Sequence, residues 1–207
     1  MPTRGTTRAA TGARSLTTRR GAPGRVRIVG GVWKRTPIAV AAVAGLRPTP
    51  DRVRETVFNW LAHLRPDTAS LRGLDLFAGT GALGFELASR GARHVLLVER
   101  DARLLAALRA LKERLAASQV EIRAGDALAV ARALAPGSFD IVFLDPPYGA
   151  GLLEPALAEV RPLLAPGGLI YAEADAPLTE EVLQPLRLRA VRAQRAGRVC
   201  FHLLSPE

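Results

Sequence analysis

From residue 73 onward, short apolar runs alternate with stretches of helical periodicity. The apolar runs predict strands at 74–77, 95–98, 120–123, 141–144 and 169–172. The periodic stretches predict helices near 82–90, 102–117, 127–134 and 152–164. Strands that alternate with helices at this spacing form a parallel, doubly wound sheet, whose strands are apolar throughout because both of its faces are covered. The pattern therefore predicts an α/β, Rossmann-like fold that ends in a β-hairpin at about 187–204.

A different pattern precedes the sheet. Paired apolar positions on either side of Gly30-Gly31 predict a small β-hairpin at 25–40, with Trp33 near its tip. An apolar stripe at 53, 57, 58 and 61 then predicts a helix that runs to about residue 64 and is capped by Thr49 or Asp51. We divide the chain into a tail (1–24), a hairpin-and-helix extension (25–64) and a main domain (65–207).

Charge is distributed unevenly along the chain. Residues 1–50 hold nine arginines and one lysine but no acidic residue, whereas residues 51–207 hold the other 19 basic and all 19 acidic side chains. The net charge of +10 therefore resides in the first quarter. A neutral body with a basic arm is typical of proteins that bind a polyanion. Residues 1–24 have too few large apolar side chains to become ordered by burial.

Three interpretations of this basic tail remain open: a disordered RNA-binding arm, an organellar transit peptide, or a start codon assigned too early. Cys200 is the single cysteine, so an internal disulfide is excluded, and the three histidines are scattered, so no metal site is expected. No apolar stretch is long enough to span a bilayer. We expect a cytoplasmic, monomeric protein.

The segment 78–84 joins the first predicted strand of the sheet to a helix. Its glycines Gly79, Gly81 and Gly84 permit a tight turn and bring a ligand close to the backbone N–H groups of the helix. Glu99 follows Gly79 by 20 residues, where a ribose-binding carboxylate belongs. The motif fits both a nicotinamide dinucleotide and S-adenosylmethionine.

Four carboxylates lie at or just beyond the ends of consecutive predicted strands: Asp75, Glu99, Asp126 and Asp145. Open α/β sheets bind ligands at this edge. Four negative charges would repel a pyrophosphate, but they suit a cationic ligand with an amino-acid end, a ribose and an adenine amine. The acids therefore favour S-adenosylmethionine over a nicotinamide cofactor.

The segment Asp145-Pro146-Pro147-Tyr148 closes the apolar run 141–144. Two prolines cannot continue a central strand, so the chain must turn out of the sheet there. The turn presents a carboxylate, free carbonyl oxygens and an aromatic face, which together suit a planar amine. An ordinary strand exit would use similar residues.

These segments resemble the bacterial 16S rRNA (guanine(966)-N(2))-methyltransferases, which methylate a guanine amine in small-subunit ribosomal RNA. The resemblance covers about residues 25–204 and rests on the segments 27–33, 46–61, 74–84 and 140–148, of which the Arg-Pro-Thr-x-Asp-Arg-Val-Arg-Glu block is the most selective. It implies a class I S-adenosylmethionine-dependent methyltransferase fold, and ribosomal RNA or an assembling small subunit as partner.

The resemblance also implies roles for single residues. The cofactor would be bound by Asp75, Ala78, Gly79, Thr80, Gly81, Gly84, Glu99 and Asp126, with Asp75 near its ammonium group, Glu99 at the ribose and Asp126 at the adenine. Asp145 and the Pro146 carbonyl would accept hydrogen bonds from the guanine amine, with Pro147 in the same turn, while Tyr148 stacks on the base. RNA would be bound by Arg27, Trp33, Lys34, Arg35, Arg47, Arg52 and Arg54. Arg52 and Arg54 fit helix-surface ion pairs with Asp51 and Glu55 equally well.

Three other functions compete with this interpretation. Another amino methyltransferase of the same fold would share the glycine loop. One that acts on a protein glutamine would be expected to have Asn in place of Asp145, and one that acts on adenine N6 in DNA usually carries a larger target-recognition insertion than 207 residues allow. A nicotinamide oxidoreductase would leave that turn and the basic arm unexplained. A catalytically inactive RNA-binding protein would not need the complete set of acids.

Overall fold

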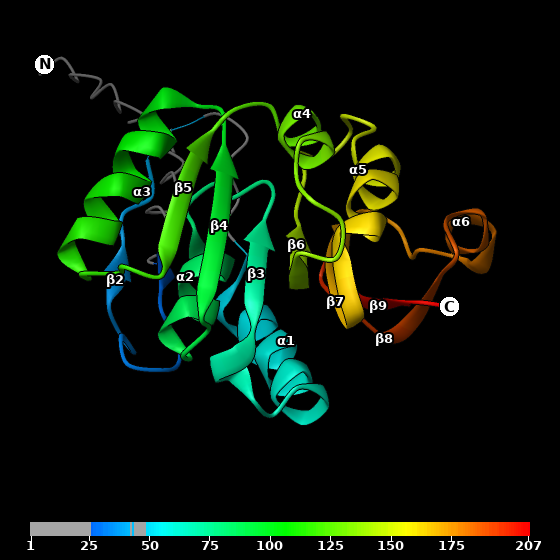
Figure 1. Cartoon of the computed structure of the whole chain (residues 1–207), viewed down its shortest axis with the longest axis horizontal. Helices are drawn as coiled ribbons and strands as arrows, with labels where there is room; N and C mark the ends of the chain where they lie inside the picture. Colours follow the sequence, from blue (N-terminus) through cyan, green and yellow to red (C-terminus); the bar gives the residue numbers. More distant parts are fainter. Residues whose placement is uncertain (1–25, 42, 44–48) are drawn as a thin grey trace, which may run out of the picture.

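The computed structural model describes residues 26–41, 43 and 49–207. Its main sheet contains β3 (Arg72–Asp75), β4 (His94–Glu99), β5 (Val120–Ala124), β6 (Phe139–Leu144), β7 (Leu164–Ala174), β8 (Leu188–Ala196) and β9 (Val199–Pro206). These seven strands are ordered β5-β4-β3-β6-β7-β9-β8 (Figure 1). The first five in this order are parallel, whereas β9 is antiparallel to both of its neighbours. The predicted doubly wound sheet is confirmed.

Two clusters of buried side chains hold helices against the two faces of this sheet. The first cluster includes side chains of α1 (Asp51–Leu64), α2 (Ala82–Ser89) and α3 (Ala102–Arg114). The second includes side chains of α4 (Ala127–Arg132), α5 (Leu153–Val160) and α6 (Glu180–Leu183). Val95 and Leu97 of β4 join the first cluster, while Leu96 and Val98 join the second. Each such strand is buried on both faces, which explains its unbroken apolar run.

Three single turns of 3₁₀ helix complete the described elements: η1 (Thr68–Ser70), η2 (Arg161–Leu163) and η3 (Gln184–Leu186). None of the helices in the described part of the chain is long and apolar enough to cross a membrane.

The N-terminal extension packs into the same core as the sheet. β1 (Val26–Arg27) and β2 (Pro37–Ile38) pair antiparallel, which confirms the predicted hairpin. Val26, Ile28 and Ile38 belong to the first cluster. In α1, the ring of Phe58 lies 5.8 Å from that of Phe143, and Trp60 stacks on Phe201 at 5.4 Å. The extension is therefore joined to the sheet by shared apolar packing.

Several predicted ends of helices and strands are wrong. α5 ends at Val160, four residues before the predicted end at 164, and β7 begins at Leu164, five residues before the predicted start at 169. α1 has Pro50 at its N-cap and no side-chain cap, because the hydroxyl of Thr49 donates to Glu173 instead. α3 ends at Arg114, three residues earlier than predicted, and the chain then turns through Ala116 with φ +49°. The first strand also begins and ends two residues before its predicted range.

The order of the strands reverses between β3 and β6, since β4 and β5 lie on one side of this pair and β7 on the other. The arrows of β3, β4 and β5 point to the same edge of the sheet in Figure 1. Ligands of open α/β sheets bind outside the carboxyl ends of the strands at such a reversal. The loops that follow β3, β4 and β6 meet there.

Candidate active site

The glycine loop lies between β3 and α2. Gly79 and Gly81 have φ values of +53° and +76°, in the left-handed region that favours glycine, and Gly81 is the N-cap of α2. A Cβ atom at Gly84 would lie 2.9 Å from Leu97 and 3.1 Å from the Oδ2 atom of Asp75. The loop is thus closely fitted to the ends of β3 and β4.

Asp75 ends β3 beneath this loop and is almost fully buried. Its Oδ2 atom accepts a 2.9 Å hydrogen bond from the backbone N–H of Gly84. Burial is the main reason that the pKa of Asp75 is raised to about 7; the Gly84 hydrogen bond opposes this shift and the charge of Glu99 adds to it. Among the described residues no side chain forms an ion pair with Asp75. A cationic ligand at this point would stabilise its ionised form.

Glu99 ends β4 and connects two loops. Its Oε2 atom accepts a 2.9 Å hydrogen bond from Gly79, and its Oε1 atom accepts hydrogen bonds from the N–H groups of Arg100 and Asp101 at 2.7 and 2.9 Å. Asp101 in turn caps α3 by accepting from Arg103 and Leu104. Glu99 therefore fixes the glycine loop as well as facing the cavity described next.

A cavity of about 200 Å³ lies over the point where the strand order reverses. Its walls include Asp75, Ala78, Gly79, Thr80, Glu99, Asp145, Pro146, Pro147 and Tyr148. A smaller cavity of about 80 Å³ shares Phe77, Glu99, Arg100 and Pro147 with it and reaches Asp126. Gly81 and Gly84 line neither cavity; they shape the turn and the start of α2.

Asp126 both caps a helix and lines a cavity. It is the N-cap of α4, where its Oδ1 atom accepts a 3.1 Å hydrogen bond from Ala129, and it also lines the smaller cavity. Apolar side chains surround it there, among them Val98, Leu128 and Leu152. The helix cap uses only one carboxylate oxygen of Asp126, so the other oxygen remains available as an acceptor. The small cavity thus combines apolar walls with one hydrogen-bond acceptor, a combination that suits a heteroaromatic amine.

The Asp-Pro-Pro-Tyr turn follows β6 on the other side of the main cavity. Pro146 is buried, whereas Pro147 and Tyr148 are exposed, with 42% of the Tyr148 surface accessible. Burial, followed by the charges of Glu173 and Asp75, raises the pKa of Asp145 well above its ordinary value. A carboxylate, a proline carbonyl and an exposed aromatic ring thus border the same space as the acids of β3 and β4.

Glu173 is the site residue that the sequence prediction missed. It lies near the end of β7, is almost fully buried, and accepts hydrogen bonds from Thr49 at 2.6 Å, Tyr171 at 2.8 Å and Tyr148 at 3.5 Å. One signal could have found it. Glu173 follows the predicted strand 169–172 directly, as Glu99 and Asp145 follow the predicted strands 95–98 and 141–144.

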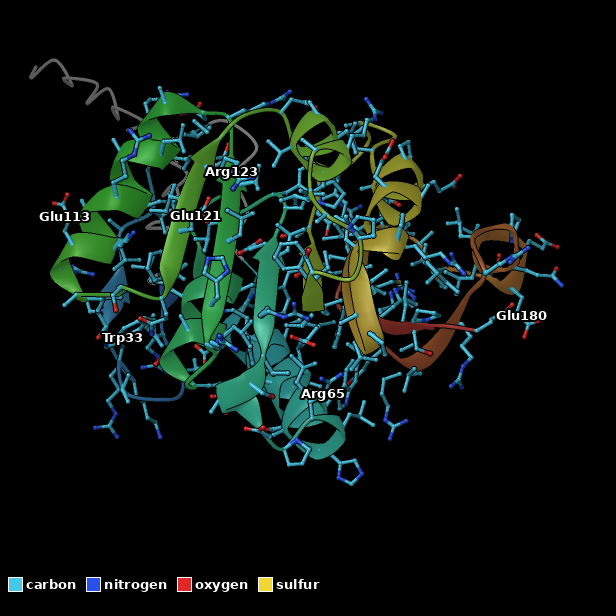
Figure 2. All side chains as sticks on the ribbon, in the orientation of Figure 1. Trp33, Arg65, Glu113, Glu121, Arg123 and Glu180 are labelled. Atoms are coloured by element: carbon cyan, nitrogen blue, oxygen red, sulfur yellow. The ribbon has the colours of Figure 1, made fainter. Side chains whose placement is uncertain are left out.

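The candidate RNA contacts fall into three groups. Arg47 and the tail 1–24 lie outside the described residues. Lys34, Arg35 and Arg52 are exposed, and Arg27 is mostly exposed although its Nε atom lies 3.0 Å from Asp51. Trp33 is partly buried against the first cluster, on the hairpin side of the molecule (Figure 2).

Arg54 requires a correction. Its side chain is completely buried, so the predicted RNA contact is wrong; the predicted ion pair with Asp51 forms, but with a buried guanidinium and not on the helix surface. It donates to Asp51 at 2.6 Å, to Glu86 at 3.4 Å, and to the carbonyl oxygens of Arg27 and Thr49 at 2.7 and 3.2 Å. A buried guanidinium needs such partners, and here they join the hairpin, α1 and α2.

Comparison with known proteins places this chain in a family. Residues 26–205 match the family described as Conserved hypothetical protein 95. The chain is 38% identical over 192 residues to the ribosomal RNA small subunit methyltransferase D of Escherichia coli K12, covering 89% of this chain and 91% of that protein. The solved structure of the Escherichia coli protein yhhF superposes with a TM-score of 0.75 at 36% identity, covering 89% and 99% of the two chains.

A more distant likeness supports the fold alone. The precorrin-6y C5,15-methyltransferase of Geobacter metallireducens has a TM-score of 0.61 at 20% identity, over 82% of this chain and 93% of that one. The sheet is thus the one found in S-adenosylmethionine-dependent methyltransferases. The chain belongs to the Conserved hypothetical protein 95 family, the family of ribosomal RNA small subunit methyltransferase D.

Proposed function

We propose that this protein is an rRNA methyltransferase that transfers a methyl group from S-adenosylmethionine to the exocyclic N2 amine of a guanine in 16S ribosomal RNA, at position 966. The observation that carries the proposal is the Asp-Pro-Pro-Tyr turn, which borders the same cavity as the acids of β3 and β4. Relatives that are named as rRNA methyltransferases support the RNA substrate.

The residues around the cavities fit S-adenosylmethionine. Asp75, a buried acid without a cationic partner in the described chain, suits the ammonium group of the methionine end. Glu99 suits the ribose hydroxyls, and Asp126 with its apolar neighbours suits the adenine. When bound, this cofactor supplies an electrophilic methyl group on a sulfonium. A pyrophosphate cofactor would instead face the carboxylates Asp75, Glu99, Asp101 and Asp145.

The acceptor side must make a poor nucleophile react. The lone pair of a guanine 2-amino group is delocalised into the ring, so the amine needs to be held in line with the methyl group. Asp145 and the carbonyl of Pro146 accept its N–H groups in this proposal. As nitrogen forms its new bond it gains positive charge, and the carboxylate of Asp145 stabilises that charge more than it stabilises the neutral amine.

Tyr148 would hold the target base. Its exposed ring borders the cavity, and a base that leaves its stack to enter a pocket recovers part of its stacking energy on an aromatic face. Arg27, Trp33, Lys34, Arg35, Arg47 and Arg52 would then bind the surrounding RNA, free or within an assembling small subunit, through phosphate and base contacts.

Nucleoside mapping tests the proposal. Ribosomal RNA from cells that lack this protein should be missing one N2-methylguanosine, and the wild-type protein should restore it whereas Asp145→Ala should not. An unchanged set of methylated nucleosides, or loss of an N6-methyladenosine instead, would refute the assigned substrate. Calorimetry with NAD and with S-adenosylhomocysteine tests the cofactor separately.

A further inference from the structure

A third cavity, of about 450 Å³, adjoins the main one at Thr49 and Tyr148. Its other walls are Pro50, Glu173, Asp175, Arg195, Arg198 and Val199. The volume is within the range of small-molecule sites. The third cavity therefore lies beside the Asp-Pro-Pro-Tyr turn, and no residue of the glycine loop lines it.

Glu173 is the buried acceptor of this cavity. The hydroxyl of Thr49 is 2.6 Å from Oε1 of Glu173 and 3.5 Å from Oδ2 of Asp145, so one side chain lies between the two carboxylates. Three hydroxyl groups donate to Glu173, and none of the described basic side chains forms an ion pair with it. Glu173, when ionised, is thus a hydrogen-bonded carboxylate with no cationic partner in the described part of the chain.

Two such carboxylates in a water-poor site destabilise each other. Burial raises the pKa of both Asp145 and Glu173, and the charge of Glu173 raises that of Asp145 further. A ligand that offers only N–H donors along one edge would relieve both groups at once. A ligand with an acceptor on that edge would add to the repulsion.

Among the bases of RNA, guanine has such an edge: its N1–H lies next to the 2-amino group. Adenine and cytosine each have a ring-nitrogen acceptor beside their amine. We propose, on the basis of the function proposed above, that the third cavity is the target-base pocket and that Glu173 accepts the N1–H of guanine while Asp145 accepts the amine. The pair of carboxylates then selects guanine. Arg195 and Arg198, exposed at the rim, suit the flanking phosphates.

Purine analogues at the target position test the contact of Glu173 with N1–H separately from the contact of Asp145 with the 2-amino group. 2-Aminopurine keeps the 2-amino group but has an acceptor at N1, whereas 6-thioguanine keeps N1–H and the amine and changes only the oxygen at C6. The wild-type protein should methylate 6-thioguanine at a rate close to that for guanine. Its kcat/KM for 2-aminopurine should be lower by about 10- to 100-fold, as for a buried acceptor that faces another acceptor.

Glu173→Gln tests the residue itself. Its amide can donate to N1 of 2-aminopurine as well as accept from N1–H of guanine, so the preference for guanine should shrink by about tenfold or more. A purely structural role would lower both rates together and leave their ratio unchanged. Glu180→Gln removes an exposed carboxylate on α6 (Figure 2) and should keep the wild-type ratio.

The outcomes distinguish this inference from the function on which it rests. If the wild-type protein methylates guanine and 2-aminopurine equally well, or if Glu173→Gln keeps the wild-type ratio, the role of Glu173 is refuted while the guanine-N2 activity stands. If the wild-type protein does not methylate guanine N2 at all, the proposed function fails instead. If Glu173→Gln does not fold, the wild-type rates for guanine and 2-aminopurine decide the question by themselves.

Discussion

The glycine-loop side and the Asp-Pro-Pro-Tyr side of the site are built differently. On the glycine-loop side, carboxylates accept from backbone N–H groups close in sequence: Asp75 from Gly84, nine residues away, and Glu99 from Gly79, 20 residues away. On the other side, Thr49 contacts Glu173 across 124 residues and Asp145 across 96. Local loop geometry arranges the first side, whereas the second exists only when distant segments pack together.

The largest effect is expected from Arg54, whose buried side chain joins the hairpin, α1 and α2 and also donates to the carbonyl of Thr49. Arg54→Leu should lower the free energy of unfolding by about 3–5 kcal/mol, because it removes a buried donor shared by four acceptors: the carboxylates of Asp51 and Glu86 and the carbonyls of Arg27 and Thr49. Denaturant unfolding measures the change. Arg52→Leu, an exposed neighbour on α1, should alter stability by less than about 0.5 kcal/mol. Equal effects of the two substitutions would show that the buried link is unimportant.

Asp145→Ala is expected to separate turnover from cofactor binding. It removes the group that stabilises charge on the amine, so kcat should fall by roughly 10²–10³-fold. Affinity for S-adenosylmethionine should change little, because that ligand is assigned to the other side. Methyl-transfer assays and calorimetry measure the two quantities, with Glu113→Ala on the outer surface of α3 as control (Figure 2). A normal methylation rate would contradict the role of Asp145.

Glu99→Ala should have the reverse pattern. Cofactor affinity is expected to weaken by about 1–3 kcal/mol, the cost of charged-acceptor hydrogen bonds left unmade, while kcat at saturating cofactor changes less. Glu121→Ala on the neighbouring strand β5, whose carboxylate pairs with Arg123 at 2.7 Å, is the matched control (Figure 2). Unaltered cofactor affinity in Glu99→Ala would remove Glu99 from the proposed site.

The pKa of Asp75, which is raised to about 7, predicts that the affinity for the cofactor depends on pH. Below pH 7 the carboxyl group is protonated, and a cationic ligand must displace that proton in order to bind. Cofactor affinity should therefore rise by up to about tenfold per pH unit toward pH 7 and then level off. Calorimetry from pH 5.5 to 8 tests this, and Asp75→Asn should flatten the profile. A pH-independent affinity in the wild-type protein would refute it.

The smallest effect concerns the tail. Deleting residues 1–24 removes five arginines and no residue of either side of the site. If the tail binds RNA, the dependence of log affinity on log salt should become shallower by roughly 0.7 to 0.9 for each phosphate that the tail neutralises. Filter-binding titrations over a range of salt concentrations measure the slope. An identical slope with and without residues 1–24 would show that the tail does not bind RNA.

Most elements of the sheet were predictable, because buried strands and amphipathic helices leave distinct periods in a sequence. Ends that depend on tertiary contacts were not. Thr49 looked like a cap for α1, but it makes a long-range hydrogen bond to Glu173. Arg54 looked like a surface charge on an amphipathic helix, but partners from the hairpin and α2 surround it. The residues next to Thr49 and Arg54 in the sequence give no indication of these distant partners.

The sequence by itself determined the doubly wound sheet, the glycine loop and the four acids at its edge, because each follows from a short-range pattern of burial or turn geometry. Only the tertiary structure decided that Thr49, Asp145 and Glu173 meet, and that Tyr148 borders two cavities. The physical reason is that a hydrogen bond between residues 96 or 124 positions apart depends on how three elements pack, and packing is a property of the whole core.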